Sequence, residues 1–207
     1  MKDKTGKLIV ISAPSGTGKT TVVKRLLEKT PNTIASVSFT TRPMRENERE
    51  GIDYFFVDKR KFETMVDSHQ FIEHATVFGN YYGTHEEVLS NNLKKGGNVI
   101  LEIDWQGAQQ VKEKMPSCIM IFLIPPSKQV LLSRLKNRGT DSEAEIENRF
   151  NQAVSDLNES NKFDHVLVND QIEVAVENIA HCIEGNFNQL NQSELVDNAL
   201  KSFYETN

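Results

Sequence analysis

The run from Leu8 to Thr21, LIVISAPSGTGKTT, constrains the fold more strongly than any other segment of this sequence. An apolar stretch leads into a loop that contains Gly16 and Gly18, and Lys19 then opens a segment whose apolar residues recur at helical spacing. Glycine lets backbone N–H groups point into such a loop, and the positive end of the following helix favours a bound anion. The run therefore predicts a strand, a phosphate-binding loop and a helix, in that order.

One position of this loop departs from the general pattern G-x-x-x-x-G-K-S/T, because Ala13 stands where the first glycine is expected. The other positions hold, so we expect the Lys19 ammonium at the β- and γ-phosphates of a nucleotide and the Thr20 hydroxyl at Mg²⁺. A plain strand–turn–helix corner, in which the glycines only shape the turn, is the alternative. The residues predicted to hold the nucleotide and its metal ion are Ala13, Pro14, Ser15, Gly16, Thr17, Gly18, Lys19, Thr20 and Thr21.

Length, charge and cysteine content limit the classes of protein to which this chain can belong. At 207 residues, the chain is long enough for one sizeable core or for a core with a small inserted domain. The net charge of −5 argues against nucleic acid as a partner, because proteins that bind it usually present a basic face. No apolar run approaches the ~20 residues that span a bilayer, and no secretory signal precedes the first strand, so we expect a cytoplasmic protein without a membrane partner. Cys118 and Cys182 are expected to be reduced, packed thiols.

Predicted strands and helices alternate along much of the chain. The Val-Ile-Leu run at 98–103 is typical of a strand buried on both faces, as parallel strands are, and further core strands are expected at 117–124 and 164–168. This alternation predicts an α/β fold with a doubly wound parallel sheet, in which ligands bind at the carboxyl ends of the strands. Lys19, Glu102 and Asn169 are all expected at those ends.

The middle of the chain has a different character. A strand is expected at Ile34–Phe39, followed by a polar loop at 40–51 that contains three arginines, and long loops of this kind are usually functional or disordered. After a helix that begins with Asp58 as its N-cap, a strand at Phe71–Val77 carries Glu73 and ends at the segment Phe78–Thr84. We interpret this part of the chain as a small lobe inserted into the main fold.

A polar helix follows the core strands. Ser142 and Glu145 form a predicted capping box for a helix that runs to about Ser160, and the polar surface of this helix suggests a mobile lid. The predicted domain boundaries are a core at 1–36, 90–138 and 161–207, a lobe at 37–89 and a lid at 139–160. The tail from 186 onward carries no motif.

Further motifs identify a family. They are Ser-Ala-Pro-Ser-Gly-Thr-Gly-Lys-Thr, Ser-Val-Ser-Phe-Thr-Thr-Arg-Pro-Met-Arg, Gly-Asn-Tyr-Tyr-Gly-Thr, Glu-Ile-Asp-Trp-Gln-Gly, Arg-Gly-Thr-Asp-Ser-Glu and Val-Asn-Asp. With them, the chain from about Lys7 to Ile183 resembles the guanylate kinases, in particular the bacterial enzymes, which share the Ala13 departure. The resemblance implies a phosphate-loop NTPase core with a GMP-binding lobe and a helical lid. It also implies Mg²⁺-dependent, in-line transfer of the ATP γ-phosphoryl group to GMP or dGMP, without a covalent intermediate. Whether identical chains associate is left open.

The residues needed to hold GMP are present. Arg42 and Arg45 suit a phosphate dianion, to which Tyr54 and Tyr82 would add phenol donors. A carboxylate at Glu73 complements the guanine N1–H and N2–H₂ donors, whereas adenine would set an acceptor against it. The predicted substrate-binding residues are Ser38, Arg42, Arg45, Tyr54, Glu73, Tyr82, Thr84, Glu102 and Asp104.

The resemblance also implies a set of catalytic cations and an adenine contact at Asn169. Alternatives remain for some of them: Arg134 as a surface ion pair, Arg45 as a solvated charge, and Glu102 with Asp104 as a strand-end charge pair. For Glu102 we favour the guanine edge or the metal shell. The predicted catalytic residues are Lys19, Arg42, Arg134, Arg138 and Arg149.

Two rival functions are weighed against this one. A guanylate-kinase-like scaffold module that binds peptides typically loses the phosphate loop or the GMP clamp, yet this sequence has both. The second rival is another phosphate-loop enzyme, such as a GTPase or a kinase for a different nucleotide or sugar phosphate. A GTPase should carry an Asn-Lys-x-Asp motif that binds guanine, and Val168-Asn169-Asp170-Gln171 does not supply it.

Overall fold

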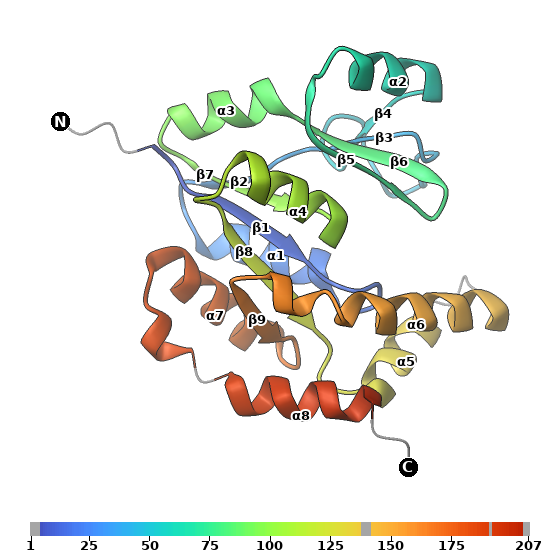
Figure 1. The fold of residues 1–207 in the computed structure, drawn as a ribbon, viewed down its shortest axis with the longest axis vertical. Helices are drawn as coiled ribbons and strands as arrows, with labels where there is room; N and C mark the ends of the chain where they lie inside the picture. The colour runs from blue at the N-terminus through green and yellow to red at the C-terminus, as the bar shows by residue number, and fades with distance from the viewer. Residues whose placement is uncertain (1–4, 138–141, 191, 205–207) are drawn as a thin grey trace. The chain divides into compact units, whose positions relative to one another are not determined.

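The computed structural model describes residues 5–137, 142–190 and 192–204 (Figure 1). The chain divides into two compact units. Unit 1 comprises Met1–Leu8 and Asn32–Cys118, and unit 2 comprises Ile9–Pro31 and Ile119–Asn207. Both units combine helices with parallel strands, so the predicted α/β class is confirmed. None of the helices in the described ranges has the length and apolar character that crossing a membrane requires.

Unit 2 is built on three parallel strands in the order β1-β8-β9. These are β1 (Leu8–Ser12), β8 (Ile119–Ile124) and β9 (His165–Val168). Every residue of β1 is buried, and β8 is buried from Met120 onward, as expected for parallel strands covered on both faces. The predicted core strands are therefore confirmed in this unit. The carboxyl end of β1 leads into the glycine-containing loop, and that of β9 leads into Asn169.

The helices of unit 2 follow these strands (Figure 1). Helices α1 (Lys19–Lys29) and α7 (Ile172–Glu184) pack against each other, and α6 (Glu143–Leu157) begins with the capping box predicted at Ser142 and Glu145. The helix ends at Leu157, short of the predicted Ser160, because a 3-10 turn follows. The helical segments are α1 (Lys19–Lys29), α5 (Lys128–Lys136), α6 (Glu143–Leu157), η1 (Ser160–Lys162), α7 (Ile172–Glu184), η2 (Phe187–Gln189) and α8 (Ser193–Tyr204).

Unit 1 contains two sets of strands. Strands β2 (Thr33–Ala35) and β7 (Asn98–Glu102) run parallel. A four-stranded sheet has the order β4-β3-β6-β5, and its core is formed by Phe62, Met65 and Phe71. The elements of this sheet and the helices of the unit are β3 (Phe39–Thr40), β4 (Phe55–Phe56), α2 (Lys59–Asp67), β5 (Phe71–Val77), β6 (Asn80–His85), α3 (Glu86–Lys94) and α4 (Trp105–Lys114).

Two predictions for this unit are wrong. The expected strand Ile34–Phe39 is two short strands in different sheets, because Ser36 N–H donates to Ile100 O of β7 whereas Ser38 O accepts from Phe55 N–H of β4. The segment Phe78–Thr84, expected to end a strand, mostly forms the partner strand β6. Only Phe78 and Gly79 make the turn, with φ angles of 48° and 77°. The expected N-cap at Asp58 is confirmed, since its side chain accepts from Lys61 N–H.

Candidate active site

The phosphate-binding loop of unit 2 lies between β1 and α1 and requires glycine at two positions. Gly16 and Gly18 have φ angles of 87° and 95°, in the left-handed region that other residues rarely adopt. Space is also lacking, since a Cβ at Gly18 would lie 2.9 Å from Asn169 Nδ2 and one at Gly16 would lie 2.9 Å from Leu131 Cδ1. Gly18 is the N-cap of α1, so Lys19 and Thr20 occupy the first turn, the part of a helix whose positive dipole end favours a bound anion.

Two side chains from elsewhere in unit 2 hold this loop through the Thr17 carbonyl. Asn169 Nδ2 donates to Thr17 O at 2.7 Å, and Arg134 Nη1 donates to the same oxygen at 3.0 Å. Arg134 Nη1 also lies 3.0 Å from Asn169 O, which links α5 to the residue that follows β9. Burial lowers the pKa of the Arg134 guanidinium, and the charge of Asp170 opposes that shift. The acceptors found for Arg134 are thus backbone carbonyls that shape the loop.

The loop also contains buried polar atoms that suit a bound nucleotide. Thr17 Oγ1 and Asn169 Oδ1 are buried and have no hydrogen-bond partner in the described part of the chain. Buried polar atoms are normally paired, so such orphaned atoms call for an explanation. A polar ligand beside the loop would supply one. Together with the glycine cradle at Gly16 and Gly18, these atoms fit a polar ligand such as a phosphate group.

In unit 1, three of the predicted substrate-binding residues, Ser38, Glu73 and Thr84, lie in one hydrogen-bonded chain. Glu73 on β5 stands opposite Thr84 on β6 in the antiparallel pair. Thr84 Oγ1 donates to Glu73 Oε1 at 2.6 Å, and Ser38 Oγ lies 3.4 Å from Thr84 Oγ1. Glu73 is only 2% exposed, which makes it a buried carboxylate with an ordered hydroxyl neighbour. Strand pairing thus brings together residues that are far apart in the sequence.

Helix α4 forms the floor beside Glu73. Asp104 is its N-cap and accepts from Gly107 N–H at 2.8 Å, and a Cβ at Gly107 would clash with Glu73 Oε2. Burial raises the pKa of the Glu73 carboxyl to about 7. The hydrogen bond from Thr84 acts to lower this pKa, whereas the negative charge of Asp104 acts to raise it. A buried carboxylate gains most from neighbouring N–H donors, and guanine offers two groups of them.

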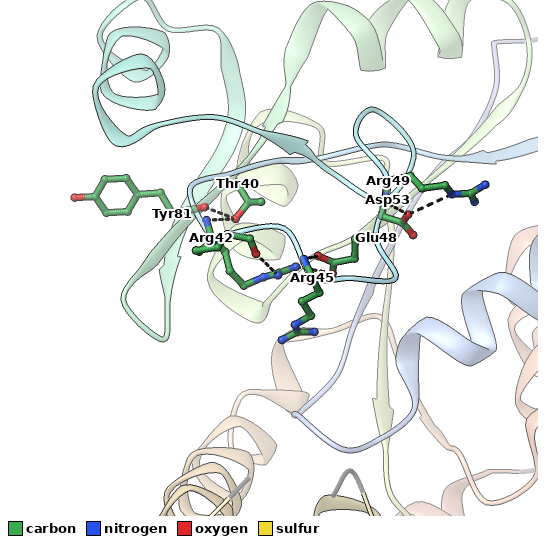
Figure 2. Close-up of polar contacts among 8 residues, drawn as sticks. Thr40, Arg42, Arg45, Glu48, Arg49, Asp53 and Tyr81 are labelled. Carbon is green, nitrogen blue, oxygen red and sulfur yellow. Dashed lines mark hydrogen bonds and ion pairs between the residues drawn. The ribbon is translucent and has the colours of Figure 1, made fainter. Parts of the chain in front are cut away.

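The arginine loop, residues 41–53 of unit 1, carries the predicted phosphate clamp (Figure 2). Arg42 Nη2 lies 2.6 Å from Glu48 Oε1, and Arg45 N–H donates to Glu48 Oε2 at 2.9 Å. One carboxylate therefore binds the side chain of the first arginine and the backbone of the second. Figure 2 shows the Arg45 guanidinium directed away from this pair, and Arg49 facing Asp53 instead.

Tyrosines flank the Arg42 guanidinium. Its carbon lies 5.5 Å from the centre of the Tyr54 ring, and the Tyr54 and Tyr82 ring centres are 6.0 Å apart. Burial lowers the pKa of Arg42, but hydrogen bonds to Glu48 and Tyr82 outweigh it, so the net shift is upward. Burial and the Glu102 charge raise the pKa of Tyr54 to about 12, so its phenol keeps its proton at neutral pH. Both side chains therefore remain donors for a phosphate.

Two residues shape these contacts in roles that the sequence did not indicate, although Gly107 is the last residue of the motif Glu-Ile-Asp-Trp-Gln-Gly. Glu48 is one of several acids in a polar loop, and only its spacing of three from Arg45 hinted at a contact. Gly107 follows an N-cap by three residues, a position where most residue types are tolerated, and nothing local reveals the carboxylate against it. Among the predicted catalytic arginines, Arg149 lies on α6, and Arg138 lies outside the described residues.

A loop with two left-handed glycines lies between a buried parallel strand and a helix. This arrangement is that of a phosphate-loop nucleotide-binding protein of the α/β class. Residues 5–186 match the family model of guanylate kinase. The chain belongs to the guanylate kinase family.

Relatives and a solved structure agree with this assignment. The guanylate kinase of Photorhabdus laumondii is 48% identical over 83% of this chain and 84% of its own length. That of Alkalilimnicola ehrlichii is 43% identical over 91% of this chain and 93% of its own length. The crystal structure of guanylate kinase from Anaplasma phagocytophilum is 34% identical, with a TM-score of 0.73 over 94% of this chain and 95% of that one.

Proposed function

We propose that this protein transfers the γ-phosphoryl group of ATP to GMP, giving ADP and GDP. The observation that carries the proposal is the buried chain of Ser38, Thr84 and Glu73 in unit 1. A carboxylate buried beside two hydroxyls is costly to maintain unless a ligand with matching donors binds there. Guanine N1–H and N2–H₂ are such donors, and the Ser38 hydroxyl suits its O6 acceptor. The Thr84 hydroxyl suits O6 as well if its single proton turns from Glu73 Oε1 to the ligand.

The GMP phosphate binds to the arginine loop in this proposal. Arg42 uses Nη2 for Glu48 and Nη1 for Pro43 O, which leaves part of its five-donor fork for a phosphate. Tyr54 and Tyr82 add phenol donors, and the Arg45 guanidinium adds a second positive charge. GMP is thus held at both ends by residues of the proposed lobe 37–89. Glu102 and Asp104 complete the proposed substrate set, although Asp104 also caps α4.

ATP binds at the phosphate loop of unit 2 in this proposal. Its phosphates meet the N–H groups of the first turn of α1 and the Lys19 ammonium, and Asn169 lies beside the adenine. Thr20 would hold Mg²⁺, whose charge offsets the negative charge of the phosphates when it is bound. Phosphoryl transfer depends mainly on positioning and charge neutralisation, and we assign further positive charge to Arg134, Arg138 and Arg149, the last from the proposed lid 139–160.

A coupled assay of ADP release with ATP, Mg²⁺ and a panel of acceptors tests the proposal. We expect turnover of GMP and dGMP, and a kcat/KM for AMP lower by about 10⁴-fold, because a site that hydrogen-bonds a distinguishing group rejects the analogue that lacks it. UMP and CMP should be equally poor. Turnover of AMP within tenfold of GMP would show that Glu73 does not read guanine. Absence of turnover with every acceptor would contradict the kinase activity itself.

A further inference from the structure

Helix α8 and the preceding Gln192 follow the residues that match the family model, yet they are packed into unit 2. Gln192, Ala199 and Phe203 are 7%, 2% and 8% exposed. The helix contacts β9 and α5. A buried polar side chain such as that of Gln192 normally has a hydrogen-bond partner. The partner shows where α8 is attached to the rest of unit 2.

Gln192 attaches the helix to the edge strand. Its Oε1 accepts from Val168 N–H at 3.0 Å in a buried setting. Val168 is the last residue of β9, which lies at the end of the order β1-β8-β9. The next residue, Asn169, donates its N–H to Ile124 O at 2.8 Å. Gln192 therefore pairs a donor on the outer side of β9, directly before the residue that holds the phosphate loop.

Two further bonds attach the helix to its other neighbours. Ser202 Oγ accepts from Lys128 N–H, the first residue of α5, at 3.1 Å. Tyr204 OH donates to Asn158 Oδ1, at the C-cap of α6, at 2.9 Å. The helix thus bonds to β9, α5 and α6, which carry or adjoin Asn169, Arg134 and Arg149.

The elements that α8 contacts carry or adjoin the two side chains that bond to the Thr17 carbonyl of the phosphate loop. Asn169 Nδ2 and Arg134 Nη1 both donate to Thr17 O, so the loop takes its shape from β9 and α5 together. We propose that α8 with Gln192 is a strap that positions Asn169 and Arg134 against the phosphate loop and so sets the affinity for ATP, with Gln192 as a positioning residue. The proposal rests on the function proposed above in naming ATP as the nucleotide.

The test uses the full chain with the substitution Gln192→Leu, which removes the acceptor and keeps most of the volume. Gln189→Leu, at an exposed residue of η2, is the matched control. Calorimetry with a non-hydrolysable ATP analogue and Mg²⁺ should show an affinity weakened about two- to thirtyfold in Gln192→Leu. Affinity for GMP should stay within twofold, and Gln189→Leu should match the wild type for both nucleotides.

A purely structural role would lower the melting temperature of Gln192→Leu without separating the two affinities, and that result would overturn the proposal. If Gln192→Leu does not fold, Ser202→Ala gives the same comparison at a half-buried residue. An affinity of Ser202→Ala for the ATP analogue equal to that of the wild type would then overturn the proposal. Failure of the proposed function can be told apart from failure of the strap proposal. The first would appear as absent GMP turnover in the wild type, whereas the second is measured only by binding of the ATP analogue.

Discussion

The phosphate loop of unit 2 and the arginine loop of unit 1 are both assigned to phosphate groups, but they are held by different forces. Thr17 of the phosphate loop is fully buried, and the loop is fixed by backbone geometry and by hydrogen bonds to one carbonyl. The arginine loop has backbone hydrogen bonds of its own, such as Glu48 N–H to Arg45 O, but its arginine side chain is held by an ion pair. The Arg42 and Glu48 side chains of that pair keep 13% and 16% of their surface exposed. We therefore expect the phosphate loop to lose nucleotide binding when a side-chain atom is added at one of its glycines. In the arginine loop, a substitution should change the affinity for phosphate by a smaller amount.

The largest effect is expected from Gly18→Ala. The added Cβ would approach Asn169 Nδ2 at 2.9 Å on a backbone with φ of 95°. A displacement of the loop by about 1 Å misplaces the phosphates, so kcat/KM for ATP should fall by about a hundredfold. The control is Gly79→Ala, where φ is 77° and nothing lies within 4 Å of the added atom. Equal activity in the two variants would mean that the close approach to Asn169 does not constrain the loop.

A smaller effect is expected from Glu48→Gln. The neutral amide weakens the hold on Arg42, so the KM for GMP should rise about two- to tenfold while the KM for ATP stays unchanged. Glu46→Gln makes the same charge change at an exposed position of the same loop and should have no effect. A lower KM for GMP in Glu48→Gln would mean that Glu48 competes with the phosphate for Arg42 instead of positioning the guanidinium.

The third prediction concerns stability instead of activity, and it follows from Glu73 and pH. Its pKa rises from an ordinary value of 4.5 to about 7 on folding, so the folded state binds more protons than the unfolded state between these values. Stability should therefore fall as pH rises through this window. Between pH 5 and pH 8, the wild type should lose about 1–3 kcal/mol of unfolding free energy relative to Glu73→Gln. Denaturant unfolding at both pH values measures this, and parallel behaviour of the two proteins would contradict the raised pKa.

The sequence predicts best what neighbouring residues determine. Gly16, Gly18 and Lys19 lie within one local pattern, and the buried strands β1 and β8 are recognisable as apolar runs. Ser38, Glu73 and Thr84 came from family resemblance, because their meeting depends on pairing of β5 with β6.

The remaining features depend on tertiary contacts that local patterns do not encode. Strand β6 was hidden because Gly79 and Gly83 flank its tyrosines and suggest a loop. The roles of Glu48 and Gly107 follow from side chains that approach them only in the folded chain. Gln192 lies in a tail without motifs, and its contact with Val168 requires β9 to be an edge strand.

The most direct test of separate phosphate sites is calorimetric titration of GMP and of the ATP analogue into both Gly18→Ala and Glu48→Gln. We expect Gly18→Ala to lose affinity for the ATP analogue and to bind GMP as the wild type does. Glu48→Gln should weaken GMP and leave the ATP analogue unaffected. Equal weakening of both nucleotides in both variants would contradict the assignment of one phosphate-binding loop to each.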